Sequence, residues 1–372
     1  MKTTAAVVHE AGKPLEIEEL DLGGPQEGEI LVRYTHAGLC HSDLHVMDGE
    51  IPGWLPMVLG HEGAGVVEDV GPGVTRVAPG DRFVCSFIPN CGTCHWCATG
   101  QQAICDMGAN TMRGFLPGEH WPLSGPAGRY GAMCMLGTFS QYGVIHQASA
   151  VKIDNDLPLD VAALVGCGVP TGWGSAVNAA DVRAGQTVVV YGIGGIGINA
   201  VQGARFAGAK YVIAVDPTPF KREKALELGA THATGDADEA RRLAVELTRG
   251  VGADKAIVTV GVTNSEVVDQ AFNAIGKAGT VVLTSMGGGF HDRTIQLPAQ
   301  VATLWKKTIK GSLFGDCNPT TDIPRLLGLY QSGDLKLDEL ITRTYTLEQV
   351  NQGYEDLVAG RNVRGLIVHK HD

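Results

Sequence analysis

Two patterns of hydrophobic and polar positions divide the chain. Over roughly the first 150 residues, short apolar or alternating runs are separated by Gly and Pro, as at 4–8, 29–35 and 65–70, which predicts β-strands. After about residue 170, continuous apolar runs alternate with segments of helical period. The order strand, helix, strand recurs at 187–192, 196–208, 211–216, 221–228, 254–261, 267–275 and 279–286. Buried strands that alternate with helices form parallel sheets with right-handed crossovers, so this part predicts a doubly wound nucleotide-binding domain of the α/β class.

A mixed pattern returns at about residue 310 and ends in an apolar run at 365–369. One uncharged stretch, 161–180, has the length of a membrane span, but Pro170 and several glycines interrupt it and it lacks a sustained Leu/Ile run. We therefore expect a glycine-rich interior turn region there.

A glycine-rich motif follows the first strand of the parallel sheet. Residues 192–197 match G-x-G-x-x-G, and Asp216 ends the next strand. In this setting the glycines allow a tight turn and close approach of a pyrophosphate, while the acidic residue accepts hydrogen bonds from the adenosine ribose and repels a 2′-phosphate. The motif predicts NAD rather than NADP. Lys221, at the start of the next helix, is either a second contact to the same ribose or a solvated surface residue. The residues expected to contact the cofactor here are Gly192, Gly194, Gly195, Ile196, Gly197, Asp216 and Lys221.

Four cysteines lie in an otherwise irregular region between residues 86 and 137. Cys91, Cys94, Cys97 and Cys105 form C-x2-C-x2-C-x7-C, which suits a closed tetrahedral zinc site that stabilises the loop. Iron–sulfur proteins share the first spacings, but the fourth differs and no proline follows Cys105. The spacing favours structural zinc.

Composition narrows the possible functions. The chain has 372 residues, 29 basic and 40 acidic, for a net charge of −11, and nine cysteines. An acidic chain is a poor nucleic-acid or membrane binder, which argues against a zinc-ribbon module that binds DNA. The first residues lack the apolar core of a signal peptide, so we expect a cytoplasmic protein whose clustered cysteines bind metal rather than form disulfides.

Other cysteines and histidines are dispersed, and spacing alone does not select a site among them. In order along the chain, however, the segment 38–43 (GLCHSD), the motif GHE-x2-G-x5-G-x2-V at 60–74, the four-cysteine loop and the glycine-rich loop resemble the zinc-dependent alcohol dehydrogenases of the medium-chain dehydrogenase/reductase superfamily. The resemblance spans essentially the whole chain. It implies a mostly-β GroES-like catalytic domain at 1–168 and 314–372, interrupted by a Rossmann domain at 169–313.

The resemblance also implies roles for single residues. Cys40, His61 and Cys167 would hold a catalytic zinc, a ligand set typical of this family. Glu62 would lie behind the metal, Asp43 would orient His61, and Ser42 and His45 would relay the substrate proton. The remaining implied contacts are Trp54 and Phe87 in the substrate pocket, Thr171 beside the nicotinamide, and His41 and Arg364 at the pyrophosphate. Many family members carry Arg where this chain has His41, which should weaken one pyrophosphate contact.

The function expected from the resemblance is hydride transfer between an alcohol/aldehyde pair and NAD(H), with two Zn2+ per chain. A homodimeric or homotetrameric assembly is expected through a strand near 303–311. The motifs look most like the nicotinoprotein subgroup, which holds NAD(H) permanently and is assayed with N,N-dimethyl-4-nitrosoaniline. Two alternatives stay open: a thiol-dependent formaldehyde dehydrogenase, and a non-catalytic NAD-binding protein on the same fold.

Overall fold

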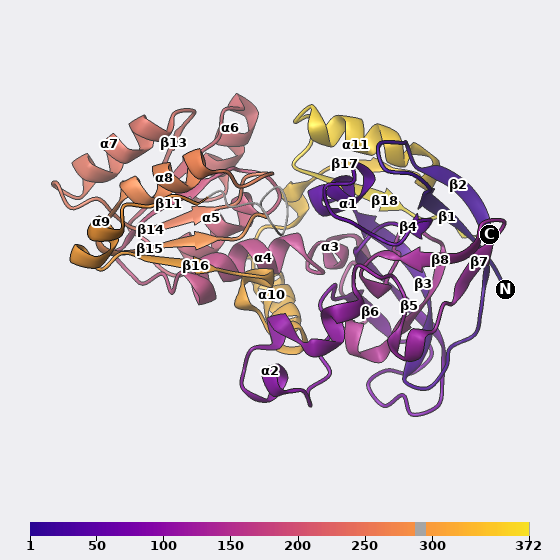
Figure 1. Ribbon diagram of the computed structural model, residues 1–372. Helices are drawn as coiled ribbons and strands as arrows, with labels where there is room; N and C mark the ends of the chain where they lie inside the picture. The colour runs from indigo at the N-terminus through magenta and orange to yellow at the C-terminus, as the bar shows by residue number, and fades with distance from the viewer. Residues whose placement is uncertain (287–294, 372) are drawn as a thin grey trace. The chain divides into compact units, whose positions relative to one another are not determined.

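The computed structural model describes residues 1–286 and 295–371, which form two compact units (Figure 1). The first contains Met1–Cys167, Asn318–Gly333 and Leu337–Asp372, and the second contains Gly168–Cys317 and Asp334–Lys336.

The first unit is built mainly from strands. A closed barrel has the strand order β1-β2-β7-β8-β4, and a second sheet has the order β10-β6-β5-β3-β18-β17, with β9 also paired to β3. The strands are β1 (Lys2–Val8), β2 (Glu16–Leu22), β3 (Glu29–Gly38), β4 (Met57–Val58), β5 (Glu62–Val70), β6 (Arg82–Cys85), β7 (Leu123–Gly125), β8 (Gly128–Ala132), β9 (Tyr142–His146), β10 (Ala150–Lys152), β17 (Ile341–Tyr345) and β18 (Arg364–Val368). The α-helices are α1 (His41–Met47), α2 (His95–Ala98), α3 (Leu159–Leu164), α10 (Pro319–Gln331) and α11 (Val350–Val358).

Strand β3 is central to the second sheet because β5, β9 and β18 all pair with it antiparallel. Its last residue, Gly38, pairs with Glu62 on one side and Leu366 on the other. Segments from the N-terminal and C-terminal parts of the sequence therefore lie side by side in this sheet.

The second unit is an α/β sandwich. Its six-stranded sheet is parallel throughout, in the order β13-β12-β11-β14-β15-β16. The strands are β11 (Thr187–Tyr191), β12 (Tyr211–Val215), β13 (His232–Thr234), β14 (Ala253–Val258), β15 (Ile275–Leu283) and β16 (Thr308–Gly311). The helices are α4 (Gly168–Gly174), α5 (Gly197–Phe206), α6 (Pro219–Glu227), α7 (Ala237–Leu247), α8 (Ser265–Ala274) and α9 (Ala299–Leu304).

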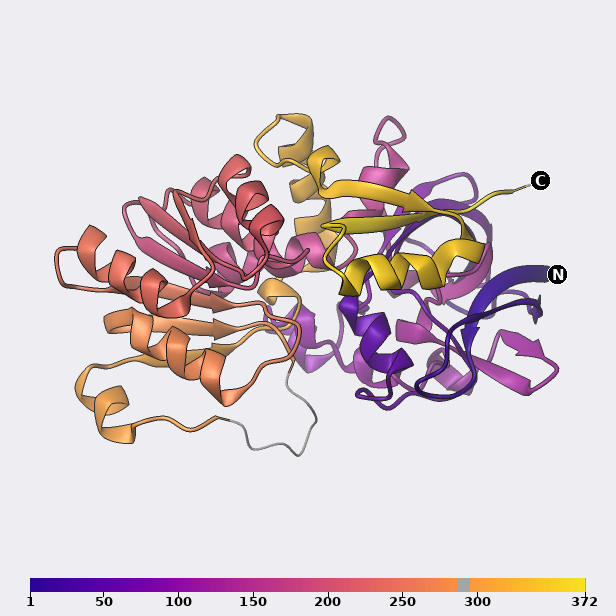
Figure 2. The same cartoon turned by 90° about the horizontal axis from the view of Figure 1, so that it is seen from above.

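Every residue of β11 is buried, because helices cover both faces of this sheet. Val189 and Tyr191 face a core that includes residues of α7 and α8, and Figure 2 shows these two helices running along the sheet. This arrangement confirms the prediction of a β-rich unit combined with a doubly wound parallel sheet.

One local expectation was wrong, and one expected strand is shorter than predicted. The stretch 161–180 is mostly helical, comprising part of α3, all of α4 and a π-helical turn at Ser175–Ala179. Its glycines serve close packing: a Cβ on Gly172 would lie 2.0 Å from the Ile196 carbonyl oxygen. The strand expected near 303–311 begins only at Thr308, because helix α9 extends to Leu304.

Candidate metal centres and nucleotide-binding loop

One candidate metal centre joins residues from three places in the first unit. Cys40, His61, Glu62 and Cys167 are all buried, and their ligand atoms lie within 4.8 Å of one another. Cys40 precedes α1, His61 directly precedes β5, Glu62 is the first residue of β5, and Cys167 follows α3. The structure thus brings together the three residues that the resemblance named as zinc ligands.

The orientation of His61 is set by a buried carboxylate. Asp43 Oδ1 accepts hydrogen bonds from His61 Nδ1 at 2.9 Å and from the Gly60 N–H at 3.0 Å. Burial alone would lower the pKa of His61, but the negative charges of Asp43 and Cys40 raise it well above its ordinary value. His61 Nε2 is buried and lacks a hydrogen-bond partner within the described part of the chain. A histidine held through Nδ1, with Nε2 free beside two cysteines, fits a zinc ion.

The two cysteines of this centre form a coupled pair. A hydrogen bond from Cys167, reinforced by the positive charge of His61, lowers the pKa of Cys40 well below its ordinary value despite burial. The same hydrogen bond raises the pKa of Cys167. Because the ligand form of cysteine is the thiolate, the environment already favours that form at Cys40.

Glu62 is held on the other side by Arg364. The Arg364 guanidinium forms a buried ion pair with Glu62 Oε2, and both side chains are almost fully enclosed. Burial raises the pKa of Glu62 to about 7, and the charge of Arg364 opposes that rise. Arg364 thus sits against the metal centre in this structure, and its expected pyrophosphate contact stays a prediction.

Two of the expected relay and pocket residues, Ser42 and Phe87, contact ligands of this centre. Ser42 Oγ is 3.7 Å from Cys40 Sγ, and His45, one turn further along α1, pairs through Nδ1 with Glu50. The Phe87 ring meets the His61 ring edge-on, with centroids 5.8 Å apart. Trp54 is 51% exposed.

Three neighbours were missed from sequence. Glu50 pairs with His45, Trp121 has its ring centroid 5.1 Å from that of Trp54, and Tyr354 lies beside Asp43. Glu50 had a weak signal, because it follows His45 by only five residues. The other two are far from their partners in sequence and belong to no motif.

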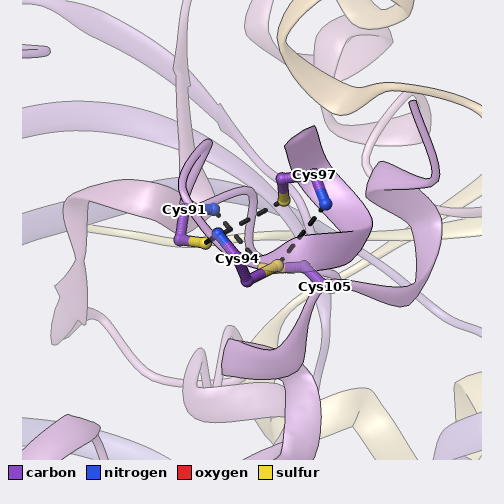
Figure 3. Close-up of side chains that lie close together, drawn as sticks. All are labelled: Cys91, Cys94, Cys97 and Cys105. Atoms are coloured by element: carbon purple, nitrogen blue, oxygen red, sulfur yellow. Dashed lines mark hydrogen bonds between the residues drawn. The ribbon is translucent and has the colours of Figure 1, made fainter. Parts of the chain in front are cut away.

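The second candidate metal centre is the four-cysteine loop. Figure 3 shows Cys91, Cys94, Cys97 and Cys105 side by side, and their sulfurs lie within 4.8 Å of one another. Burial opposes ionisation of Cys91, but the backbone N–H groups of Thr93 and Cys94 lower its pKa to about 6. N–H donors directed at sulfur stabilise thiolates, and four thiolates at this spacing leave no position for substrate.

The glycine-rich loop opens helix α5 in the second unit. Gly192 adopts φ +85°, and a Cβ on Gly197 would lie 1.9 Å from the Gly192 carbonyl oxygen, so both positions require glycine. At Gly194 the space within 4 Å is open, as close approach of a phosphate needs. Asp216 Oδ2 accepts a hydrogen bond from the Ile193 N–H at 2.8 Å, with the Lys221 ammonium 4.0 Å away. Gly195 and Ile196, also expected to contact the cofactor, lie in the same loop. Of the other expected cofactor residues, Thr171 is buried in α4 and His41 is the first residue of α1.

A GroES-like unit with two cysteine-based metal centres and a separate dinucleotide-binding unit define a zinc-dependent dehydrogenase. Comparisons agree with this class: residues 26–155 match the alcohol dehydrogenase GroES-like domain, and residues 195–332 match the zinc-binding dehydrogenase domain. The chain is 61% identical to the NDMA-dependent alcohol dehydrogenase of Amycolatopsis methanolica over 372 residues, covering 100% of both chains. It is 59% identical to the putative alcohol dehydrogenase D of Mycobacterium tuberculosis, covering 99% of this chain and 100% of that one.

Solved structures give the same result. The crystal structure of benzyl alcohol dehydrogenase from Acinetobacter calcoaceticus matches with a TM-score of 0.92 and 31% identity, covering 100% of both chains. The chain belongs to the zinc-binding alcohol dehydrogenases. It is an enzyme with two zinc sites, one catalytic and one structural, and it uses NAD, which confirms the expected activity and cofactors. Within the described residues, no helix has both the length and the apolar character required to cross a membrane.

Proposed function

We propose that this alcohol dehydrogenase is a nicotinoprotein, which retains its NAD(H) through the catalytic cycle and passes the electrons to a second carrier. The observation that carries the proposal is the 61% identity, over both full lengths, to a protein named as NDMA-dependent. The pre-positioned Asp216 carboxylate, hydrogen-bonded to the Ile193 and Thr218 N–H groups, supports tight binding of the adenosine ribose.

The two domains have different roles in this proposal. Residues 1–168 and 314–372 form the catalytic domain, and residues 169–313 bind the cofactor. Bound at this centre, the catalytic zinc would supply Lewis-acid chemistry at the substrate oxygen, and NAD would supply the hydride acceptor. Ser42 accepts the hydroxyl proton of the alcohol before hydride transfer, and His45 passes it to solvent, with Glu50 paired to the imidazole at Nδ1.

The remaining expected residues complete the site. Phe87 and Trp54 form walls of the pocket, Thr171 contacts the nicotinamide, and His41 and Arg364 approach the pyrophosphate. Because Phe87 lies edge-on against the His61 ring, a substrate reaching the metal would pass an aromatic wall. This favours alcohols with an apolar substituent.

The test is the near-ultraviolet spectrum of protein purified without added cofactor. A nicotinamide band that survives gel filtration, together with alcohol-dependent bleaching of N,N-dimethyl-4-nitrosoaniline without added NAD, is the expected result. Loss of the band, with activity only on addition of NAD, would show an enzyme with a dissociable cofactor. Activity on formaldehyde that requires a small thiol would favour the formaldehyde dehydrogenase alternative.

We further propose that the protein forms dimers or tetramers through β16, the terminal strand of the parallel sheet. Leu304, Trp305 and Leu313, which flank this strand, are 69%, 44% and 44% exposed. Light scattering coupled to gel filtration gives the assembly size, and Trp305→Glu should shift it toward the monomer. We expect the protein to be cytoplasmic and to bind neither nucleic acid nor membranes. Salt-dependent retention on DNA would contradict the expectation for nucleic acid.

A further inference from the structure

Tyr354, on helix α11, brings a buried hydroxyl to the carboxylate of Asp43. The side chain is 3% exposed, and within the described residues its hydroxyl forms no regular hydrogen bond. Burial raises the pKa of Tyr354 well above its ordinary value, and the negative charge of nearby Asp43 raises it further. The phenol is therefore neutral and keeps its proton for donation.

The Asp43 carboxylate has capacity for another donor. Its Oδ1 accepts from His61 Nδ1 and from the Gly60 N–H, whereas among the described residues Oδ2 accepts a long 3.3 Å contact from the Cys40 N–H. Asp43 is completely buried. A buried carboxylate without enough donors carries a large desolvation penalty, and a buried hydroxyl without an acceptor carries a smaller one. A single O–H···O bond from Tyr354 to Asp43 relieves both.

Packing fixes the tyrosine in this position. The Tyr354 ring lies 6.3 Å from the Phe139 ring in an edge-to-face arrangement. The preceding residue, Gly353, allows α11 to approach the segment that carries Cys40, since a Cβ there would lie 2.4 Å from Leu39 Cδ1. Close packing of α11 against the segment that carries Leu39 and Cys40 thus places the hydroxyl near Asp43.

We propose that Tyr354 is a positioning residue of the catalytic zinc site, acting through Asp43 on His61. Its O–H donates to the carboxylate, the carboxylate keeps its orientation toward His61 Nδ1, and Nε2 stays directed at the metal. Groups that orient metal-bound histidines typically change metal affinity by about 10- to 100-fold. Tyr354 acts one contact further away, so we expect the lower end, ~10-fold. The inference rests on the zinc site and not on permanent retention of NAD.

The experiment compares Tyr354→Phe with the wild-type holoenzyme. Zinc release into excess chelator is followed for both zincs of each chain, and the visible absorption of a cobalt-substituted sample reports the ligand geometry. We expect one zinc to leave ~10-fold faster, the other to leave at the wild-type rate, and the cobalt band to shift. The value of kcat should fall more than KM changes, because the defect lies at the metal.

Tyr345→Phe is the matched control. Tyr345 is also buried and donates its hydroxyl to Asp356 at 2.7 Å in the same unit, but Asp356 belongs to neither metal centre. When Asp43 is already replaced by Asn, Tyr354→Phe should change zinc release little further, because Tyr354 acts through Asp43.

Zinc release within twofold of wild type and an unchanged cobalt band in Tyr354→Phe would overturn the proposal. So would equal acceleration of zinc release in Tyr345→Phe, which would indicate general loosening. These readouts count zinc, so they stand whether or not the purified protein carries nicotinamide.

Discussion

The carboxylate of Asp216 is hydrogen-bonded to the backbone N–H of Ile193 at 2.8 Å, which joins the end of β12 to the glycine-rich loop. Its other oxygen accepts from the Thr218 N–H at 2.9 Å. Both bonds fix a negative charge at the position where we propose that the adenosine ribose binds. A carboxylate held there would select the unphosphorylated dinucleotide.

Replacing Asp216 by Asn should relax this selectivity. The amide keeps one acceptor oxygen but loses the charge that repels a 2′-phosphate, so the preference for NAD over NADP should fall about 10- to 100-fold, as for loss of a charged hydrogen bond. Chromatography of the nucleotide extracted from purified protein, and binding of both dinucleotides, measure the change. Asp269→Asn, in an exposed carboxylate of α8 that accepts a hydrogen bond from Asn273, is the control. An unchanged NAD/NADP ratio would refute the role of Asp216.

Metal analysis should find two zinc ions per chain. Cys40→Ser should retain one and lose alcohol oxidation, because it removes a ligand beside the substrate position. Cys94→Ser should also retain one, but chiefly lower the midpoint of thermal unfolding, because the loop loses its crosslink. Cys85→Ala, a buried cysteine outside both clusters, should keep both zincs. Full alcohol oxidation by Cys40→Ser would contradict the assignment.

Ser42→Ala should lower kcat by about 10²- to 10⁴-fold while leaving the zinc content at two, because the first proton acceptor of the relay is lost. His45→Gln should have a smaller defect that added imidazole partly restores. Because the two residues act in series, the double variant should be little worse than Ser42→Ala. Stopped-flow measurement of the first turnover tests this, and multiplicative defects would argue against a common relay.

Gly38→Ala should disturb the Glu62–Arg364 ion pair. A Cβ at this position would lie 2.4 Å from Glu62 Oε2 and 2.9 Å from Arg364 Nη2, and both side chains are enclosed. We expect the free energy of unfolding to fall by about 1–3 kcal/mol, as for other overpacked sites. Gly24→Ala, where a Cβ meets nothing within 4 Å, should have no such effect in the same urea titration. Equal stability of the two variants would exclude the crowding argument.

His369 should make stability depend on pH. Burial, together with the nearby His371 and His36, lowers its pKa to about 4, against the opposing effects of the hydrogen bond to the Thr138 carbonyl and of Glu348. Below about pH 6.5, His369 therefore binds a proton in the unfolded chain but stays neutral in the folded chain. This contribution to stability is complete above that pH and is lost as the pH falls toward 4. The loss between pH 7 and pH 5 is about 2 kcal/mol.

His369→Gln keeps a donor for the Thr138 carbonyl, which His369 Nε2 contacts at 2.9 Å, but cannot titrate. Urea unfolding at several pH values should therefore show a shallower acid slope in this variant. His232→Gln, at a partly exposed position in β13, should retain the wild-type slope. A wild-type slope in His369→Gln would assign the acid sensitivity to other groups.

The features that sequence determined are local ones. The four-cysteine loop closes within 15 residues, and the glycine-rich loop and Asp216 are separated by one helix, so short-range spacing was enough to identify both. The strand and helix periods likewise identified the parallel sheet. In 161–180 the composition misled, because glycine normally disfavours helices but is retained here for close packing, as where a Cβ on Gly174 would lie 2.3 Å from the Gly315 carbonyl oxygen.

The catalytic centre required more than spacing. Cys40, His61 and Cys167 are dispersed, and only family resemblance selected them from the other cysteines and histidines. The structure explains why they meet: β3 ends beside the first residues of β5, and α3 packs against both strands. Neither pairing leaves a signal within a short stretch of sequence.

The sequence by itself therefore determined the two-part fold, the structural zinc loop and the dinucleotide loop, because periodicity and spacing record interactions between near neighbours. Only the tertiary structure placed Arg364 against Glu62 and Tyr354 beside Asp43, contacts that join positions about 300 residues apart. Burial then decided what these groups do. Removing a carboxylate from water makes its orientation depend on the few donors that the fold brings to it.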